Sequence, residues 1–104
     1  MLSKSYIKTV VKKYLRSLPI KSEFVILFGS SISENRLRNS DIDLIVVSDD
    51  FKKMSFHERL FLLQKHWKHD IDLEALGYTV EEFNRLKEKS IVIQEAVEKG
   101  EMIK

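Results

Sequence analysis

The chain has 104 residues, which is enough for one compact domain and excludes a two-domain polymerase or a multidomain synthetase. Hydrophobic residues make up 43% of the sequence and charged residues 33%, a balance typical of a folded domain with a charged surface. The formal charge of +2 is too small to predict nucleic-acid binding, and the absence of cysteine excludes disulfides, thiolate catalysis and cysteine-ligated zinc.

The N-terminal segment is predicted to form an amphipathic helix that ends before Pro19. Its apolar residues recur at steps of three and four, with basic residues between them: Leu2, Tyr6, Ile7, Val10, Val11, Tyr14, Leu15 and Leu18. We expect the basic residues to form a solvated face rather than a nucleic-acid contact. The segment has no apolar run suited to a signal peptide or a membrane span, so we expect a cytoplasmic protein.

Two apolar segments that follow are predicted to be strands. Residues 24–28 are apolar at every position, which is typical of a strand buried on both faces, and Gly29-Ser30 ends this strand. Residues 42–47 form the second strand, and Asp41 and Asp43 lie at its start.

Ser55 and Glu58 have the spacing of a capping box, which predicts the start of another helix. One face of this helix carries apolar residues that we expect in the core: Phe56, Leu60, Leu63 and Trp67. A third strand is predicted over residues 69–76. Apolar residues alternate there with acids, in the order Asp70, Ile71, Asp72, Leu73, Glu74 and Ala75.

The C-terminal part is predicted to be helical. Thr79 and Glu82 repeat the capping-box spacing and start one helix. Ser90 is expected to cap a last helix that stops at Gly100, where we expect a left-handed backbone conformation. No linker or repeat divides the chain, so residues 1–104 are predicted to form a single domain.

Asp41 and Asp43 are the first candidate catalytic residues. Alternation along a strand places both on one face, about 6.5 to 7 Å apart, while their neighbours point into the core. Two such acids can share one magnesium ion or bridge two, because magnesium takes one or two carboxylates and fills its other positions with water and substrate phosphate. A third acid across the sheet, Asp72 or Glu74, would help to deprotonate an attacking hydroxyl.

The turn after the first strand provides a candidate phosphate site. Gly29 allows the backbone to approach a triphosphate closely, and Ser30 with the amides after it can donate hydrogen bonds to phosphate oxygens. Together with the acids, this turn predicts the transfer of a nucleotidyl group from its pyrophosphate.

These residues resemble the hallmark of the polymerase β nucleotidyltransferase superfamily. The hallmark is carried by Leu27-Phe28-Gly29-Ser30 and by Ser40-Asp41-Ile42-Asp43-Leu44. The size of the chain and the segment Gly77-Tyr78-Thr79-Val80-Glu81-Glu82-Phe83 resemble the minimal nucleotidyltransferase (MNT) branch. The resemblance extends from about Phe24 to Gly100.

The resemblance implies an α+β nucleotidyltransferase fold with a small mixed sheet flanked by helices. It implies magnesium-dependent transfer of AMP from ATP, or of another nucleoside monophosphate, to a hydroxyl group, with two magnesium ions. It also implies a helical HEPN-type partner that forms a toxin–antitoxin pair with this chain and offers a tyrosine as acceptor.

Site residues are implied position by position. Asp41 and Asp43 would be metal ligands, and the third acid would be Asp72 or Glu74, of which we favour Asp72 as a further ligand because it lies mid-strand. The phosphates would be contacted from the turn and the loop after it, by Gly29, Ser30, Ser31, Arg36 and Arg38. Residues 31–35 lack the basic residues that many relatives have there, so Arg36 and Arg38 are expected to compensate.

Two other functions stay open from the sequence. The chain could be a non-catalytic antitoxin that masks its partner, or it could modify a small molecule or RNA, for which dimerisation or a partner must complete the acceptor site. Exposed apolar residues such as Phe61, Ile91 or Val97 would mark a partner interface. His66 and His69 are three residues apart, but we do not expect a zinc site there.

Overall fold

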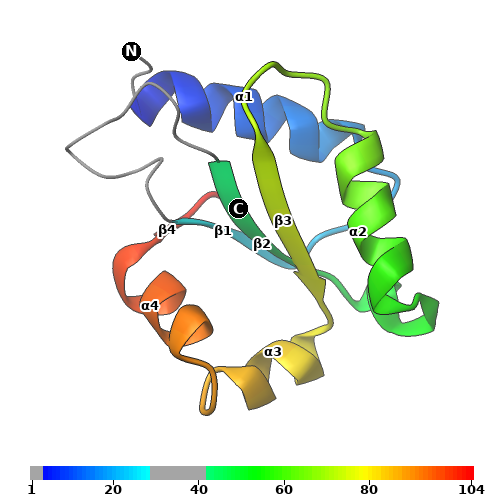
Figure 1. The fold of residues 1–104 in the computed structure, drawn as a ribbon, viewed down its shortest axis with the longest axis vertical. Helices are drawn as coiled ribbons and strands as arrows, with labels where there is room; N and C mark the ends of the chain where they lie inside the picture. The colour runs from blue at the N-terminus through cyan, green and yellow to red at the C-terminus, as the bar shows by residue number, and fades with distance from the viewer. Residues whose placement is uncertain (1–3, 29–41) are drawn as a thin grey trace.

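The computed structural model describes residues 4–28 and 42–104, which form a mixed sheet with helices on both faces. Within these residues the sheet has four strands in the order β3-β2-β1-β4 (Figure 1): β1 is Phe24–Phe28, β2 is Ile42–Val47, β3 is Leu73–Tyr78 and β4 is Glu101–Met102. Strand β1 is antiparallel to both β2 and β4, whereas β2 and β3 are parallel. The predicted α+β architecture is therefore confirmed, and the bounds of β1 and β2 match the prediction.

The helices lie in pairs on the two faces of the sheet. Their bounds are Lys4–Ser17 for α1, Asp49–Lys53 for the 3-10 helix η2, Phe56–Lys65 for α2, Val80–Leu86 for α3 and Ile91–Lys99 for α4. Helices α1 and α2 bury apolar residues against one face together with η2, and α3 and α4 do so against the other face. In the described part of the chain, no helix is long and apolar enough to cross a membrane.

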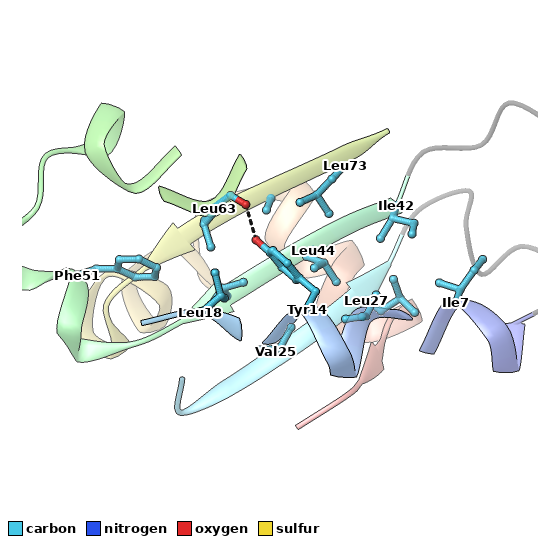
Figure 2. Close-up of a cluster of buried hydrophobic side chains, with 13 residues drawn as sticks. Ile7, Tyr14, Leu18, Val25, Leu27, Ile42, Leu44, Phe51, Leu63 and Leu73 are labelled. Atoms are coloured by element: carbon cyan, nitrogen blue, oxygen red, sulfur yellow. Dashed lines mark hydrogen bonds between the residues drawn. The ribbon is translucent and has the colours of Figure 1, made fainter. Parts of the chain in front are cut away.

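The larger core lies between the sheet and helices α1 and α2 (Figure 2). Strand β2 contributes alternate residues to it, namely Ile42, Leu44 and Val46, which are fully buried. The Tyr14 hydroxyl donates a 2.7 Å hydrogen bond to the Leu63 carbonyl oxygen, as Figure 2 shows, and so links α1 to α2. Burial raises the pKa of the Tyr14 phenol far above its ordinary value, so this donor keeps its proton.

The smaller core lies on the opposite face. The intervening β2 residues Ile45 and Val47 meet Phe83 of α3 and Ile93 and Ala96 of α4 there. Because β2 is covered on both faces, its residues from Leu44 to Val47 are apolar without alternation. Asp43 is the exception in this strand.

Three predicted helix starts are confirmed by their caps. Ser55 and Glu58 form a complete capping box, and so do Thr79 and Glu82, each with the hydroxyl accepting from the third helical amide and the glutamate accepting from the cap amide. The Ser90 hydroxyl accepts from the amide of the third residue of α4. These local bonds satisfy amides that have no partner inside the helix.

The third strand starts later than predicted. Residues 69–72 are not a strand, and β3 runs from Leu73 to Tyr78. The Ile71 carbonyl accepts from the Trp67 indole at 2.6 Å, and the Ile71 amide donates to His69 Nδ1 at 3.2 Å. Because both backbone groups of Ile71 are bonded within this turn, they do not join the sheet.

The end of α4 also differs from the prediction. Gly100 has φ −81° and ψ 176°, which is extended rather than left-handed, because the chain enters β4 at the next residue. A Cβ at this position would lie 2.5 Å from the Ala96 carbonyl oxygen and 2.8 Å from Ile26 Cγ2. Glycine is therefore required there by close approach.

The prediction that Phe56 of α2 lies in the core is wrong. Phe56 is 43% exposed, whereas Arg59, on the same helix, is 6% exposed. Leu63 is buried as predicted, and Leu60 and Trp67 are partly buried. Phe56 is the first residue of α2, so it lies beyond the part of the helix that covers the sheet.

Candidate active site

Two candidate acids lie side by side at the start of the parallel strands. Asp43 is the second residue of β2, Glu74 is the second residue of β3, and the two are Cα partners in the parallel register. Neighbouring strands are about 4.8 Å apart, so the two side chains leave the same face at adjacent positions. Their carboxylates can therefore bind one ligand together.

The hydrophobic neighbours of these acids fix the face on which they lie. Ile42 and Leu44 flank Asp43, and both are 0% exposed in the larger core. Leu73 and Ala75 flank Glu74 and are buried in the same core. Alternation then directs both acids to the opposite face of the sheet, where Asp43 is half-buried and Glu74 is exposed.

Asp72 lies at the same end of the sheet, just before β3. Its carbonyl oxygen accepts a 2.9 Å hydrogen bond from the Ile42 amide, which continues the pairing of β2 with the chain before β3. Its side chain is exposed, as is that of Glu74 two residues later. Both acids that the sequence offered as the third carboxylate are thus within two residues of the Asp43 register position.

The first strand ends beside the same position. Phe28, the last residue of β1, is the antiparallel partner of Asp43. The candidates that complete the predicted site lie outside the described residues: Gly29, Ser30, Ser31, Arg36, Arg38 and Asp41. The structure therefore brings together Asp43, Asp72 and Glu74 and describes the end of the strand that leads into the predicted phosphate turn.

Carboxylates at this end of the sheet have the right chemistry for magnesium, which prefers oxygen ligands and needs only one or two from the protein. Across residues 4–28 and 42–104, no group of three or more His, Asp or Glu side chains is close enough together to hold a metal ion. Asp43 and Glu74 lie at paired register positions, and Asp41, which the sequence predicts as a metal ligand, lies outside the described residues.

The candidate histidine His69 takes part in local contacts. Its Nδ1 accepts from the Ile71 amide, so in the neutral ring the proton is on Nε2, which can donate to the Tyr6 hydroxyl at 3.1 Å. The ring also lies 5.8 Å from the ring of Trp67. These contacts connect α1 to the turn that precedes Asp72.

A second group of polar residues, which the sequence analysis missed, lies at the other end of β3. Arg59 donates from Nη1 to Glu82 Oε1 at 2.6 Å and from Nη2 to Glu82 Oε2 at 3.3 Å. The hydrogen bonds from Arg59 are the main reason that the pKa of Glu82 is lowered. The pKa of the nearby Tyr78 phenol is raised, first by desolvation and then by the charge of Glu82. The capping-box position of Glu82 was visible in the sequence, but nothing there indicated that Arg59 would be buried against it.

Two comparisons with known proteins give matches that cover most of the chain. The family model described as "Polymerase beta, Nucleotidyltransferase" matches residues 7–104. The crystal structure of a candidate nucleotidyltransferase from Sulfolobus solfataricus is similar, with a TM-score of 0.53 and 26% sequence identity over 79% of this chain and 71% of that chain. A comparison with curated proteins gives no match.

Proposed function

Because the chain belongs to the polymerase beta nucleotidyltransferase family, we propose that it transfers AMP from ATP to a hydroxyl group in a magnesium-dependent reaction. The register pairing of Asp43 with Glu74 is the observation that supports this proposal most directly. In this register Asp43 also pairs with Phe28, the last residue of β1, and Gly29 and Ser30 follow Phe28 in the sequence.

The residues have distinct proposed roles. Asp41 and Asp43 hold the magnesium ions, and either Asp72 or Glu74 completes the acid group and takes the proton of the acceptor hydroxyl. Gly29, Ser30 and Ser31, with Arg36 and Arg38, contact the phosphates. When bound, magnesium neutralises charge on the phosphate oxygens in the transition state.

The reaction balances as a displacement at the α-phosphorus of ATP. The acceptor oxygen forms a bond to this phosphorus, the bond from the phosphorus to the bridging oxygen breaks, and pyrophosphate leaves. The acceptor proton passes to a carboxylate at the start of β3. The register supports Glu74 for this role because it is opposite Asp43, and its longer side chain reaches farther from the sheet than that of Asp72.

We propose that the acceptor is a tyrosine of a helical HEPN-type partner and that the chain acts as the antitoxin of the pair. Apolar side chains exposed on the described surface give a partner something to bury: Phe61 at 68%, Ile91 at 74%, Val92 at 54%, Val97 at 47% and Met102 at 65% exposure. Ile91, Val92 and Val97 all belong to α4, so we propose that the partner packs on this helix.

The test is transfer of labelled AMP from ATP to the partner in the presence of magnesium. We expect Asp43→Asn to lower the transfer rate by at least about 100-fold, the size of effect typical when a group that stabilises transition-state charge is removed. Asp72→Asn and Glu74→Gln, measured in parallel, identify the third acid by the larger loss. Glu81→Gln is the matched control, because Glu81 is an exposed carboxylate on α3, beyond the other end of β3.

Undiminished transfer by Asp43→Asn would refute the proposed site. If the wild-type protein binds the partner but transfers no label, the chain masks its partner without modifying it. Transfer to RNA or to a small molecule instead of the partner would retain the chemistry and change the acceptor.

A further inference from the structure

A cavity lies at the end of β3 that is farthest from the acid pair. It has a volume of about 410 Å³ and is lined by residues of α2, β3, α3 and the segment after α3: Phe56, Arg59, Tyr78, Glu82, Arg85, Leu86 and Lys89. Tyr78 is four residues beyond Glu74 in β3, which corresponds to about 13 Å along a strand. In Figure 1 the tip of β3 and the start of α3 lie at the opposite end of the sheet from the start of β2. The cavity is therefore separate from the proposed transfer site.

A buried guanidinium forms part of its wall. The Arg59 side chain is 7% exposed. Besides its two bonds to Glu82, it donates from Nε to the Met54 carbonyl at 3.1 Å and from Nη1 to the Gly77 carbonyl at 3.2 Å. A guanidinium has five N–H donors, and these contacts use four of them. One N–H on Nη2 thus has no acceptor among the described residues.

The charge around the cavity is positive. Glu82 is neutralised by Arg59. The Tyr78 phenol adds no negative charge, because a phenol is protonated at neutral pH and desolvation and the Glu82 charge raise the pKa of Tyr78 further. Arg85 and Lys89 add two cations, and neither forms an ion pair within the described part of the chain. The wall therefore offers an anion a phenol and two exposed cationic side chains, with the spare N–H of Arg59 as a further donor.

The apolar part of the wall consists of two aromatic residues and Leu86. The rings of Phe56 and Tyr78 are 6.3 Å apart between centroids and are tilted by 38°, so they form an open wedge rather than a closed stack. Phe56, the first residue of α2, is 43% exposed. A flat ring placed on this wedge would cover apolar surface that water now contacts.

We propose that this cavity binds a small organic anion that carries a flat aromatic ring, with the ring against Phe56 and Tyr78 and the phosphate or carboxylate on Arg59, Arg85 and Lys89. The volume lies within the range of about 300 to 1,000 Å³ that is typical of small-molecule sites. Ring and anion each have complementary groups in the wall, so a ligand with both parts should bind more tightly than a ligand with either part alone. The site is independent of nucleotidyl transfer.

The probes are AMP and phenylacetate. Each combines an aromatic ring with an anionic group, which is a phosphate in AMP and a carboxylate in phenylacetate. Adenosine supplies a ring without charge, and inorganic phosphate supplies charge without a ring. Binding is followed by amide chemical shifts of the full chain in EDTA, so that no metal assists binding at the acid pair. We expect AMP or phenylacetate to shift Tyr78 and Arg85 more than Glu74 and to bind at least about five-fold more tightly than adenosine or phosphate.

Exposed residues serve as test variants because their substitution leaves the core intact. We expect Phe56→Ala and Arg85→Gln each to weaken binding by about five-fold or more. Phe61→Ala and Lys13→Gln are matched controls, an exposed phenylalanine of the same helix and an exposed lysine on α1, and we expect neither to change binding.

Binding of AMP alone identifies a nucleotide ligand, and binding of both probes identifies aromatic acids in general. The proposal is overturned if neither probe binds, if adenosine or phosphate binds as tightly as the probes, or if the Phe56 and Arg85 variants bind like the wild type.

Discussion

The Arg59–Glu82 pair makes a prediction about stability and its pH dependence. The pair joins α2 to the first turn of α3, and its arginine is 7% exposed while its glutamate is 32% exposed. The substitution Glu82→Gln keeps the shape of the side chain and an oxygen that can accept from the Thr79 amide. It removes the negative charge and leaves a buried guanidinium without its counterion.

The expected loss at pH 7 is about 2 kcal/mol. A hydrogen bond to a charged group contributes about 1.5 to 3 kcal/mol, and the retained amide oxygen and the partial exposure of Glu82 keep the loss well below the ~3 to 5 kcal/mol of a fully buried broken pair. For a domain of this size, 2 kcal/mol corresponds to a fall in Tm of about 10 °C.

The pH dependence has a definite sign. The pKa of Glu82 is lowered in the folded protein from its ordinary value of 4.5. The stability that this carboxylate contributes is thus fully present above pH 4.5 and is lost as the pH falls through the folded-state pKa. The difference in unfolding free energy between wild type and Glu82→Gln should therefore be constant near neutral pH and shrink in acid.

Urea unfolding of both proteins between about pH 7 and pH 3 measures this difference. Glu81→Gln, an exposed change one residue earlier, should stay within about 0.5 kcal/mol of the wild type at every pH. A gap between wild type and Glu82→Gln that persists unchanged into acid, or no gap at neutral pH, would contradict the assignment of the charge pair.

Substitutions at three further sites test a buried hydrogen bond, a close contact in the core and a helix cap. Tyr14→Phe removes the 2.7 Å bond to the Leu63 carbonyl but keeps the ring, so urea unfolding should show a loss of about 1 to 2 kcal/mol; a loss below 0.3 kcal/mol would contradict this. Gly77→Ala would place a Cβ 2.8 Å from Phe51 Cε2, so we expect a loss of about 1 to 3 kcal/mol that Phe51→Leu partly reverses in the double variant, and additive losses would refute the clash. Ser55→Ala should cost about 1 kcal/mol through its cap, whereas Ser55→Asp should lie close to the wild type in thermal unfolding, and equal losses in the two variants would exclude a capping role.

Local patterns in the sequence were sufficient for most elements. Two apolar runs predicted β1 and β2 with their observed bounds, because a strand covered on both faces needs no polar position. The capping boxes at Ser55 and Thr79 predicted the starts of α2 and α3, because these bonds involve residues only three apart. Such features depend on neighbours in the chain and need no knowledge of the fold.

The start of β3 and the burial of Arg59 were not predictable in the same way. The acids Asp70, Asp72 and Glu74 alternate with apolar residues as in one strand, yet only Glu74 lies within β3, because the Trp67 indole holds the Ile71 carbonyl in a turn. Arginine side chains are usually exposed, so the residue type of Arg59 predicts a position in solvent. It is buried because Glu82, 23 residues away, reaches it from another helix.

The sequence names Asp43 and Glu74 as candidate acids, but it does not give the register that pairs their strands. Alternation alone places Asp43 and Glu74 on the outer face of their own strands, but the pattern contains no information on the offset between β2 and β3. That offset follows from packing of Leu44 against the same core as Ala75, its register partner. The sequence offered both Asp72 and Glu74 and favoured Asp72 because it was expected to lie mid-strand, whereas β3 begins after Asp72 and the register puts Glu74 opposite Asp43.

Asp43 also helps to define the register that its proposed function requires. The other residues of β2 are all apolar, and both faces of the strand are covered along most of its length, so hydrophobicity distinguishes the two faces only weakly. A shift of β2 by one residue would turn Asp43 into the larger core, among residues that are 0% exposed. Burying an unpaired carboxylate costs several kcal/mol, a large fraction of the ~5 to 15 kcal/mol that stabilises a typical domain. The charge of Asp43 therefore disfavours any alignment of β2 that turns this residue into the core. In the alignment that remains, Asp43 is the register partner of Glu74.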